Sequence, residues 1–588
     1  LDRDLPGLRE WVGWGAFAGL VMGLPVGGLM AFQGMLRDGG RSETSAWVLF
    51  LTYATAAGVA IGLFAPRTRG LALAATGGVM IGLLSWLLFS LTVDPVLHGR
   101  APTWSVSAAA AAYRDLVGDL LHGGLTGVLV YALWSRWARR PRPASPPAGM
   151  QEPAQVVIVG GGFAALGAAK RFEQLALRGH RIDVTLISRS NFQLFTPMLA
   201  EVASGALEPA HISTPIRAAV AHTRFRHATV DDVDTLARTV RLGGTVAPEL
   251  IPYDHLVLAV GSVPHFLGLP GVEEHAHTLK DLPDAMLLRD HVIRLLERAD
   301  HNEPDPLERQ RLLTFVVAGG GFAGAETIAE LFDLVHGVLH YFPGISPREP
   351  RFVLVHSRDR ILPESSAELG AYAMGRLQAR GIQFRLGVRV AEATASDVLL
   401  DDGDRIPTLS FVWTAGNRPS PLISCLAGVH ARNGALVADP TCRVTGLDRV
   451  WAVGDCAQVP DVDREGAPFP PTAQHALRQG RVVADNIAAV LAGRTPAEFR
   501  FRALGLLVAL GHRTAAAEIR GRQFSGLAAW LLWRGIYLAK LPGMEKRVRV
   551  LLDWLLDLAF PRDIVLTTPR TAEPAESDRQ ADREAPRS

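Results

Sequence analysis

Two glycine-rich loops, each directly after a short run of buried-type residues, constrain the fold of this chain more than any other feature. The first loop, Gly160–Ala165 (GGGFAA), follows Gln155–Val159 (QVVIV), and the second, Gly319–Gly324 (GGGFAG), follows Leu313–Ala318 (LTFVVA). Short apolar, β-branched runs are typical of parallel strands that are covered on both faces. A glycine turn between such a strand and a helix brings backbone N–H groups close to a phosphate. The sequence therefore predicts an α/β protein with two dinucleotide-binding folds.

The glycines have separate tasks in such a loop. Gly160 permits the tight turn, Gly162 leaves room for a pyrophosphate beside the backbone, and Ala165 is small enough for the helix to pack on the strand. The second loop has glycine at all three places: Gly319, Gly321 and Gly324. One such loop alone can be an ordinary strand-to-helix turn. Because two loops occur 159 residues apart, we expect two nucleotides.

Later segments return to the first of these folds. Tyr253–Ser262 (YDHLVLAVGS) and Val450–Gln458 (VWAVGDCAQ) end in glycine turns, and Trp413–Gly416 marks a strand end where the chain recrosses between domains. Asp455 is placed to accept a hydrogen bond from a sugar hydroxyl, with a helix cap as the alternative. We therefore predict two nested Rossmann-like domains, the first formed by residues 155–275 and 406–496 and the second by residues 276–405.

The first 135 residues contain four apolar runs of membrane-spanning length. The longest is uncharged over 26 residues, which as a helix would measure ~39 Å and cross a ~30 Å hydrocarbon core. Asp119 and His122 make the fourth run the weakest. They are functional candidates within the membrane, and the alternatives are a polar contact between spans or a position close to the membrane interface. We predict a four-helix transmembrane domain over residues 1–135, with spans at Trp11–Leu36, Ala46–Ala65, Gly70–Val93 and Leu116–Ser135.

Arginine counts orient these predicted spans. Eight arginines lie in the N-terminal tail, the second loop and the segment after the fourth run, and four lie in the first and third loops. Because cytoplasmic loops carry the excess of positive charge, the N-terminus and the residues from 136 on are expected in the cytoplasm. Residues 136–154, rich in proline and arginine, are expected to form an extended linker, and residues 567–588 a disordered tail.

Composition argues against several kinds of function. The chain has 60 basic and 58 acidic residues and a net charge of +2, which gives no reason to expect a nucleic-acid partner. Its three cysteines, Cys425, Cys442 and Cys456, include no pair at CxxC spacing. A disulfide framework, a structural zinc site and a dithiol redox motif are therefore not expected, and no metal ligands are predicted.

Residues 155–566 resemble the type II NADH dehydrogenases, the non-proton-pumping NADH:quinone oxidoreductases of the FAD-dependent pyridine nucleotide-disulphide oxidoreductase superfamily. Besides the segments above, the matching motifs are NFQLFTPMLAEVASGAL (191–207), VWTAGNRPSP (412–421), PPTAQHALRQG (470–480), LLWRGIYLAKLPG (531–543) and VLLDWLLDLAF (550–560). The resemblance implies hydride transfer from NAD(P)H to FAD and then transfer of two electrons to a quinone without proton pumping. It does not extend to residues 1–150.

The resemblance also implies site residues. FAD would be held by Gly160, Gly162, Phe163, Ala164, Ser188, Arg189, Val230, Ala259, Gly261, Asp455, Ala473 and Gln474. NAD(P)H would be held by Gly319, Gly321, Gly324, Glu326, Glu330 and His356. The quinone would meet Gln474, His475 and Arg478, and the catalytic residues would be Gln474, His475 and Glu330, the last near the nicotinamide. His475 is expected either to supply a proton near neutral pH or to make a structural hydrogen bond.

Three positions depart from the expected pattern. The second strand of a dinucleotide fold often ends in an acid that binds the ribose hydroxyls. The first fold has Ser188 there, which can still form a hydrogen bond, and the second has His356, followed closely by Arg358. Because a cation here can bind a 2′-phosphate, NADPH stays open as a substrate beside NADH. Arg478 stands where the family often has glutamine, so a glutamine that orients a quinone carbonyl is not assumed there.

The C-terminal residues 497–566 are expected to dock the protein on a membrane. Leu527–Tyr537 and Val548–Phe560 are apolar, rich in tryptophan and surrounded by basic residues, as in helices that lie on an anionic lipid surface. The alternative is a helix buried against the protein or a partner subunit. Together with the spans, this region predicts a multi-pass protein of the cell inner membrane with its catalytic domain on the cytoplasmic side. The expected partners are a quinone and the lipid bilayer, and a homodimer is left open.

Two other functions compete with this one. A sulfide:quinone oxidoreductase shares the fold but needs redox cysteines beside the flavin, and this chain has none before Cys425. A non-catalytic flavin-based redox sensor would signal through the N-terminal spans, and only the extra N-terminal domain supports it. The sequence does not assign a role to these spans.

Overall fold

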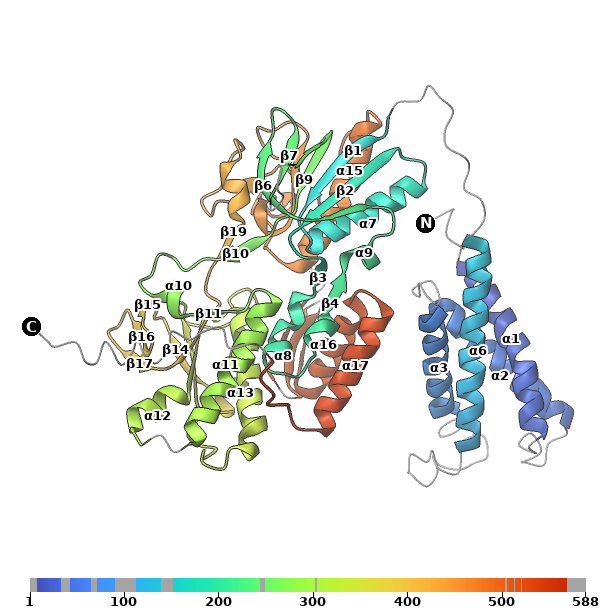
Figure 1. Ribbon diagram of the computed structural model, residues 1–588, viewed down its shortest axis with the longest axis horizontal. Coiled ribbons are helices and arrows are strands. Elements are labelled where there is room, and N and C mark those ends of the chain that lie inside the picture. Colours follow the sequence, from blue (N-terminus) through green and yellow to red (C-terminus); the bar gives the residue numbers. More distant parts are fainter. Residues whose placement is uncertain are drawn as a thin grey trace, which may run out of the picture. The chain divides into compact units, whose positions relative to one another are not determined.

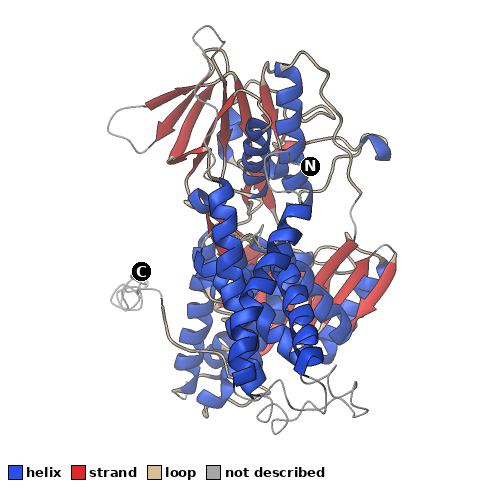
Figure 2. Cartoon of the chain, turned by 90° about the vertical axis from the view of Figure 1, so that its right-hand side faces the viewer, coloured by secondary structure: helices blue, strands red, loops and turns tan. Residues whose placement is uncertain are grey.

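The computed structural model divides into two compact units, one made of residues up to Glu152 and one made of nearly all residues from Pro153 on. The described strands all lie in the second unit, and the first unit is helical (Figure 1 and Figure 2). Most of the predicted linker and nearly all of the predicted tail fall outside the described residues. The structure describes residues 8–32, 43–64, 71–89, 113–138, 152–243, 249–301, 304–502, 505–511, 513–519 and 521–567.

Each predicted apolar run in the first unit forms a helix: α1 (Leu8–Phe32), α2 (Glu43–Phe64), α3 (Leu71–Leu88) and α6 (Tyr113–Ala138). Glycines let the helices of each pair approach closely. A Cβ atom on Gly19 or Gly58 would collide with the backbone of the opposite helix in the α1–α2 pair, and the same holds for Gly78 and Gly123 in the α3–α6 pair. Small residues of this kind allow backbone contact between membrane helices.

The buried polar groups of this bundle are hydrogen-bonded to one another. Tyr53 Oη donates to Asp119 Oδ2 over 2.8 Å, and His122 Nε2 lies 3.0 Å from the carbonyl oxygen of Gly19. Thr126 lies 3.4 Å from the same His122 nitrogen. The structure therefore favours the interpretation of Asp119 and His122 as polar contacts between helices.

Two helical segments are long and apolar enough to cross a membrane, judged by length and composition over the described residues: Trp11–Gly28 and Asp115–Arg136. The apolar segments of the other two helices, Trp47–Leu63 and Ala74–Leu88, are shorter. The fourth run, the weakest in the sequence, is thus one of the two that qualify. The four-span arrangement stays a prediction.

The first sheet of the second unit is entirely parallel, with strand order β21-β9-β1-β2-β5. Helices α7 (Phe163–Leu177) and α15 (Ala473–Leu491) pack on one face of β1, and β6 and β7 pack on the other. The strands are β1 (Ala154–Val159), β2 (Ile182–Ser188), β5 (Arg224–His227), β9 (His255–Leu258) and β21 (Val450–Ala452).

The second sheet repeats this design with strand order β11-β18-β12-β13-β14, again all parallel. Its strands are β11 (His277–Thr278), β12 (Thr314–Ala318), β13 (Arg351–His356), β14 (Gln383–Leu386) and β18 (Ser410–Trp413). Helices α11 (Leu282–Asp300), α13 (Phe322–Val338) and α14 (Ala367–Ala379) share one core with it. The predicted boundary at residue 405 is too early, because β18 pairs with β12 and completes this sheet.

A two-stranded antiparallel ribbon connects the two folds. It consists of β10 (Ser262–Pro264) and β19 (Asn417–Pro419), and Trp413 Nε1 donates to the carbonyl oxygen of His265 over 3.0 Å. The remaining short strands are β3 (Phe192–Leu194), β4 (Ser213–Pro215), β6 (Thr229–Asp234), β7 (Thr239–Gly243), β8 (Glu249–Pro252), β15 (Val390–Ala393), β16 (Asp397–Leu400), β17 (Arg405–Pro407), β20 (Leu436–Val437) and β22 (Ala457–Gln458). The short helices are α8 (Leu199–Ala203), α9 (Ile216–Ala219), α10 (Val272–His275) and α12 (Pro306–Leu312).

The C-terminal region forms a small antiparallel sheet and two helices. The elements are β23 (Gly505–Ala509), β24 (Ala515–Ile519), β25 (Arg522–Ser525), α16 (Gly526–Lys540) and α17 (Met544–Ala559). The tryptophans that supported a lipid-facing surface, Trp530, Trp533 and Trp554, lie instead in the protein core, so that part of the prediction is wrong. The large apolar side chains that are exposed on and directly after these two helices are leucines and one phenylalanine: Leu527, Leu531, Leu552, Leu555, Leu556, Leu558 and Phe560.

Candidate active site

The first glycine loop forms an open cradle at the end of β1. Gly160 has a φ of +125°, and a Cβ atom there would collide with the carbonyl oxygen of Ala259. A Cβ on Gly162 would meet nothing within 4 Å, so space remains beside the backbone where a pyrophosphate approaches. Phe163 and Ala164 begin α7, whose N-terminus favours an anion. The loop therefore fits the pyrophosphate of FAD.

The next predicted flavin residues lie along the edge of this cradle. Ser188 ends β2, is buried, and accepts a hydrogen bond at Oγ from the backbone N–H of Ser190 over 3.2 Å. The carbonyl oxygen of Arg189 lies 3.0 Å from His227 Nε2. Val230 lies on β6 and packs against the core beneath β1. Ser188 and Arg189 are thus held by hydrogen bonds between side chains and backbone, and Val230 is held by apolar packing.

Asp455 lies in the turn after β21, a strand of the same sheet as β1. Its Oδ2 atom accepts a hydrogen bond from Ser262 Oγ over 2.8 Å, and Ser262 directly follows Gly261. The backbone N–H of Gly454 donates to Gln479 Oε1 over 2.8 Å, which ties the turn to α15. The N-cap of the short helix after β21 is Val453 and that of α15 is Thr472, so Asp455 caps neither helix.

The second glycine loop forms a matching cradle at the end of β12. Gly319 has a φ of +116°, and a Cβ on Gly324 would collide with the carbonyl oxygen of Gly319. A Cβ on Gly321 would have Glu364 Oε1 as its nearest neighbour, 3.9 Å away. This loop therefore also leaves space for a pyrophosphate at the start of α13.

His356 closes over the second loop. Its Nδ1 atom accepts a hydrogen bond from the backbone N–H of Gly320 over 3.0 Å, so the ring proton of the neutral form lies on Nε2. Burial, and then the charge of Arg358, lowers the pKa of His356, which keeps the ring neutral. Nε2 is buried and has no partner within the described chain. An oxygen of a bound nucleotide can satisfy this N–H group.

The predicted quinone residues lie on the first turns of α15. His475 is buried, with Nδ1 2.7 Å from Thr472 Oγ1, and its ring packs against Phe469 and Phe501. Burial, with the charge of Arg478 adding to it, lowers the pKa of His475. This arrangement favours the structural hydrogen bond over proton supply by His475.

The other two quinone candidates are less enclosed. Gln474 is half-buried at the start of α15, and its carbonyl oxygen accepts a hydrogen bond from Arg478 Nη1 over 2.9 Å. The Arg478 guanidinium lies 4.0 Å from the centre of the Phe501 ring. Ala473 precedes them as the first residue of the helix.

The structure adds aromatic and basic residues that the sequence did not indicate. Ring contacts run from Phe163 at the first loop to Phe195, with centroids 5.8 Å apart, and from Phe195 to Tyr537 on α16, 6.1 Å apart. Lys540 Nζ lies 5.5 Å from the centre of the Tyr537 ring. Burial, with the charge of Arg478 adding to it, lowers the pKa of Lys540. No local spacing connects these residues, which is why sequence patterns missed them.

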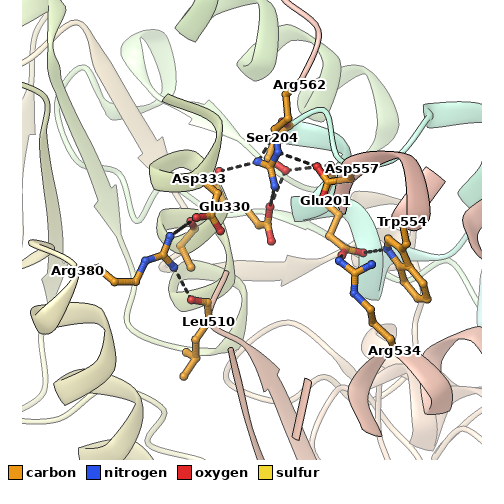
Figure 3. A network of polar contacts seen from close by, with 11 residues as sticks. Glu201, Ser204, Glu330, Asp333, Arg380, Leu510, Arg534, Trp554, Asp557 and Arg562 are labelled. Atoms are coloured by element: carbon orange, nitrogen blue, oxygen red, sulfur yellow. Dashed lines mark hydrogen bonds and ion pairs between the residues drawn. The ribbon is translucent and has the colours of Figure 1, made fainter. Parts of the chain in front are cut away.

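Glu330 belongs to a buried polar network that joins α13 to the C-terminal region (Figure 3). Ser204 Oγ donates to Glu330 Oε2 over 2.6 Å, and Arg562 Nη2 lies 3.3 Å from the same oxygen. Arg562 also pairs with Asp557 over 3.2 Å. Burial raises the pKa of Glu330, while Arg562 opposes that effect. These contacts engage Glu330 in holding the chain together, and its role near a nicotinamide stays a prediction.

Glu201 and Arg534 form the second part of this network (Figure 3). The two side chains lie 3.7 Å apart, and Trp554 Nε1 donates to Glu201 Oε2 over 3.3 Å. The Arg534 guanidinium lies 4.2 Å from the Trp530 ring centre and 4.5 Å from that of Trp554. Burial raises the pKa of Glu201 to about 8 despite Arg534. A cavity of about 10 Å³ between these groups has room for one water molecule.

Glu326 lies one helical turn before Glu330 on the same face of α13. Its Oε1 atom accepts a hydrogen bond from the backbone N–H of Ala509 over 3.2 Å. Burial raises the pKa of Glu326 to about 8. Both predicted acids on α13 therefore contact the C-terminal region, as their shared face required.

Two family models match this chain. The pyridine nucleotide-disulphide oxidoreductase model matches residues 154–480, and the NDH2 C-terminal domain model matches residues 504–563. Together they cover both nucleotide-binding folds and the C-terminal region.

Curated relatives show the same pattern. The chain is 32% identical over 418 residues to a probable NADH dehydrogenase of Dictyostelium discoideum, a match that covers 70% of this chain and 90% of that protein. It is 32% identical over 431 residues to the type II NADH:quinone oxidoreductase Ndh of Mycobacterium tuberculosis, with 70% and 90% covered.

Solved structures support the fold. NDH2 of Plasmodium falciparum, solved in complex with NADH, is 18% identical and superposes with a TM-score of 0.65 over 70% of this chain and 100% of that one. A sulfide:quinone oxidoreductase of Aquifex aeolicus is 17% identical, with a TM-score of 0.54 over 71% of this chain and 96% of that one. At these identities the likeness concerns the fold alone.

Proposed function

The chain belongs to the type II NADH:quinone oxidoreductases, a family of pyridine nucleotide-disulphide oxidoreductases, and we propose how its own residues serve that reaction. The protein oxidises NADH with FAD as cofactor and passes two electrons to a quinone without pumping protons. The observation that carries the residue assignment is the pair of open glycine cradles at the ends of β1 and β12.

The two cradles bring the reactants together. FAD, when bound, accepts the hydride of NADH and passes the two electrons on to the quinone. The protein contributes position, because holding two reactants in alignment removes most of the entropy cost of their encounter. The first loop and Asp455 hold the flavin, and the second loop holds NADH. The His356 Nε2–H group donates to an oxygen of the nucleotide.

The quinone enters beside the first turns of α15. Gln474 offers an amide, and Arg478 and Lys540 provide two cations, each beside an aromatic ring. Phe195 and Tyr537 provide aromatic walls between this entrance and the first loop. An apolar site with a few polar groups is typical of a binding site for a quinone head group.

Proteins of this family are membrane-associated, and two parts of this chain support a specific attachment. The exposed leucines recur at helical spacing on α16 and α17, with Leu531 58% and Leu555 53% exposed, and they form an apolar face that can enter a lipid surface. The four N-terminal helices would span the inner membrane, with the catalytic unit on the cytoplasmic side, as the arginine distribution indicates.

The competing functions have less support. Sulfide chemistry needs reactive thiolates, but Cys442 and Cys456 are buried, and burial raises the pKa of Cys456 to about 11. The third cysteine, Cys425, is exposed. A redox sensor would bind both nucleotides without turning them over.

Steady-state assays of the full chain test the proposal. NADH and NADPH are each oxidised in the presence of a menaquinone or a ubiquinone analogue, with and without an uncoupler in proteoliposomes. We expect FAD-dependent turnover of NADH that does not change when the uncoupler is added. Bound FAD without quinone-dependent turnover would contradict the proposal and favour the sensor.

A further inference from the structure

Lys280 is a basic residue outside the predicted site that lies where the two nucleotide-binding folds meet. It follows β11 of the second sheet and precedes α11. The chain has 60 basic residues, of which only Lys170, Lys280, Lys540 and Lys546 are lysines. A compact ammonium group is thus unusual in this protein, and here it lies beside a carboxylate of the other fold.

The contacts of Lys280 lead directly to the flavin cradle. Its Nζ atom donates to Ser262 Oγ over 2.8 Å, and Ser262 Oγ donates to Asp455 Oδ2 over 2.8 Å. Nζ lies 4.0 Å from Asp455 Oδ2 and 3.5 Å from Asn417 Oδ1. A cation from the second fold is therefore linked to an acid of the first fold through the start of the connecting ribbon.

The backbone around Lys280 is fixed. Asp284 Oδ2 accepts hydrogen bonds from the backbone N–H of Lys280 and from Thr278 Oγ1, each over 2.8 Å. Asp281 and Asp284 form a capping box at the start of α11. Because the segment is held at both ends, the ammonium group stays near Asp455 without depending on a flexible loop.

We propose that Lys280 is a positioning residue for the cofactor, whose charge compensates Asp455 and thereby favours two-electron reduction of the flavin. Reduction adds negative charge to the bound cofactor, and an uncompensated carboxylate beside it would oppose that change. The ammonium group beside Asp455 removes this opposition. The inference rests on the proposed function, since it requires FAD in the first cradle.

The flavin reduction potential tests this proposal, measured by spectroelectrochemical titration of the full-length holoenzyme. Lys280→Gln keeps a donor for Ser262 but removes the charge. We expect the ratio of reduced to oxidised flavin at a fixed solution potential to fall about tenfold, equivalent to ~30 mV for a two-electron couple. Lys280→Arg keeps the charge and is the matched control, expected within about twofold of the unmodified protein.

Several results would overturn it. An unchanged flavin reduction potential in Lys280→Gln would do so. An equal shift of the potential in Lys280→Arg would also do so, because the effect would then come from the shape of the side chain rather than from its charge. Lys280→Met is a second neutral variant. Loss of flavin from both neutral variants would also contradict the proposal, since the charge would then serve binding of the oxidised cofactor. Absence of flavin from the unmodified protein would instead contradict the proposed function.

Discussion

The two nucleotide-binding folds of this chain use the same backbone and different side chains. Both are parallel five-stranded sheets with a positive-φ glycine after the central strand. At the end of the neighbouring strand, the first fold has Ser188 and the second has His356, each lying against the middle glycine of its loop. Glycines and strand order thus make the cradle in both folds, and we propose that the residue at the strand end adapts each cradle to its nucleotide.

The helices that follow the loops differ in what covers them. In the first fold, α15 packs so closely on α7 that a Cβ atom on Gly480 would collide with the carbonyl oxygen of Ala164. In the second fold, the acids of α13 contact the C-terminal region through Ala509 and Arg562. The first helix is therefore enclosed within its own domain, and the second helix holds the C-terminal region.

The largest expected effects come from filling the two cradles separately. Gly162→Val and Gly321→Val each place a side chain in the open space where a pyrophosphate would lie. We expect Gly162→Val to lose the flavin and all activity, and Gly321→Val to abolish NADH oxidation while retaining the flavin. Visible absorbance and NADH consumption separate the two outcomes. Loss of the flavin from Gly321→Val would mean that the loops are assigned in the wrong order.

Removing Arg562 tests how the second fold holds the C-terminal region. Arg562→Ala leaves the buried Glu330 and Asp557 carboxylates without their cation, and breaking a buried pair costs about 3–5 kcal/mol. Urea unfolding followed by tryptophan fluorescence measures the loss, because Trp533 and Trp554 lie in the same core. The exposed pair of Arg224 and Asp183 provides the control, and Arg224→Ala should cost less than about 1 kcal/mol. Equal costs would contradict the assigned role of Arg562.

The buried Glu201 makes the stability of the same region depend on pH. Its pKa rises from 4.5 to about 8 on burial, so the folded protein keeps a proton that the unfolded chain releases. The free energy of unfolding should fall by about 1.4 kcal/mol for each pH unit between the pKa of the unfolded chain and that of the folded protein. The stabilisation is complete below the unfolded pKa and is lost above the folded pKa. Denaturation at several pH values should show a shallower slope for Glu201→Gln. An unchanged slope would exclude Glu201 as the source.

The smallest expected effect concerns the strand end of the second fold. Arg358 is exposed beside His356 and can pair with a 2′-phosphate. Arg358→Ala should lower kcat/KM for NADPH about tenfold, or ~1.4 kcal/mol, and change NADH oxidation little. Arg351→Ala, at the exposed start of the same strand, is the matched control. An equal loss of kcat/KM with NADPH and with NADH would show that Arg358 does not bind the 2′-phosphate.

Sequence patterns predicted the parts of the fold that consecutive residues encode. The strand before each loop, the turn and the helix after it are local, and Gly319–Gly324 contains all three glycines that the turn needs. The domain boundary failed at β18, because a four-residue buried strand does not reveal which of two similar sheets it joins.

The site could be predicted only where one segment carries it. Glu330 and Arg562 are 232 residues apart, and no spacing rule links them. Composition alone predicts that the tryptophans of α16 and α17 face lipid. In the structure, Trp530 and Trp554 pack on the Arg534 guanidinium instead. The ion-pair partner of Arg534, Glu201, lies on a distant segment of the chain. The sequence left the role of His475 open because its ring partners, Phe469 and Phe501, come from two different segments and only the fold brings them together.

Anaerobic reduction and reoxidation of the bound flavin shows whether NADH, FAD and a quinone react in sequence on this protein. The purified full-length protein is mixed with NADH and then with a soluble quinone while the yellow absorbance is followed. We expect NADH to bleach the chromophore and the quinone to restore it. A colourless protein, or a yellow one that NADH leaves unchanged, would contradict this expectation.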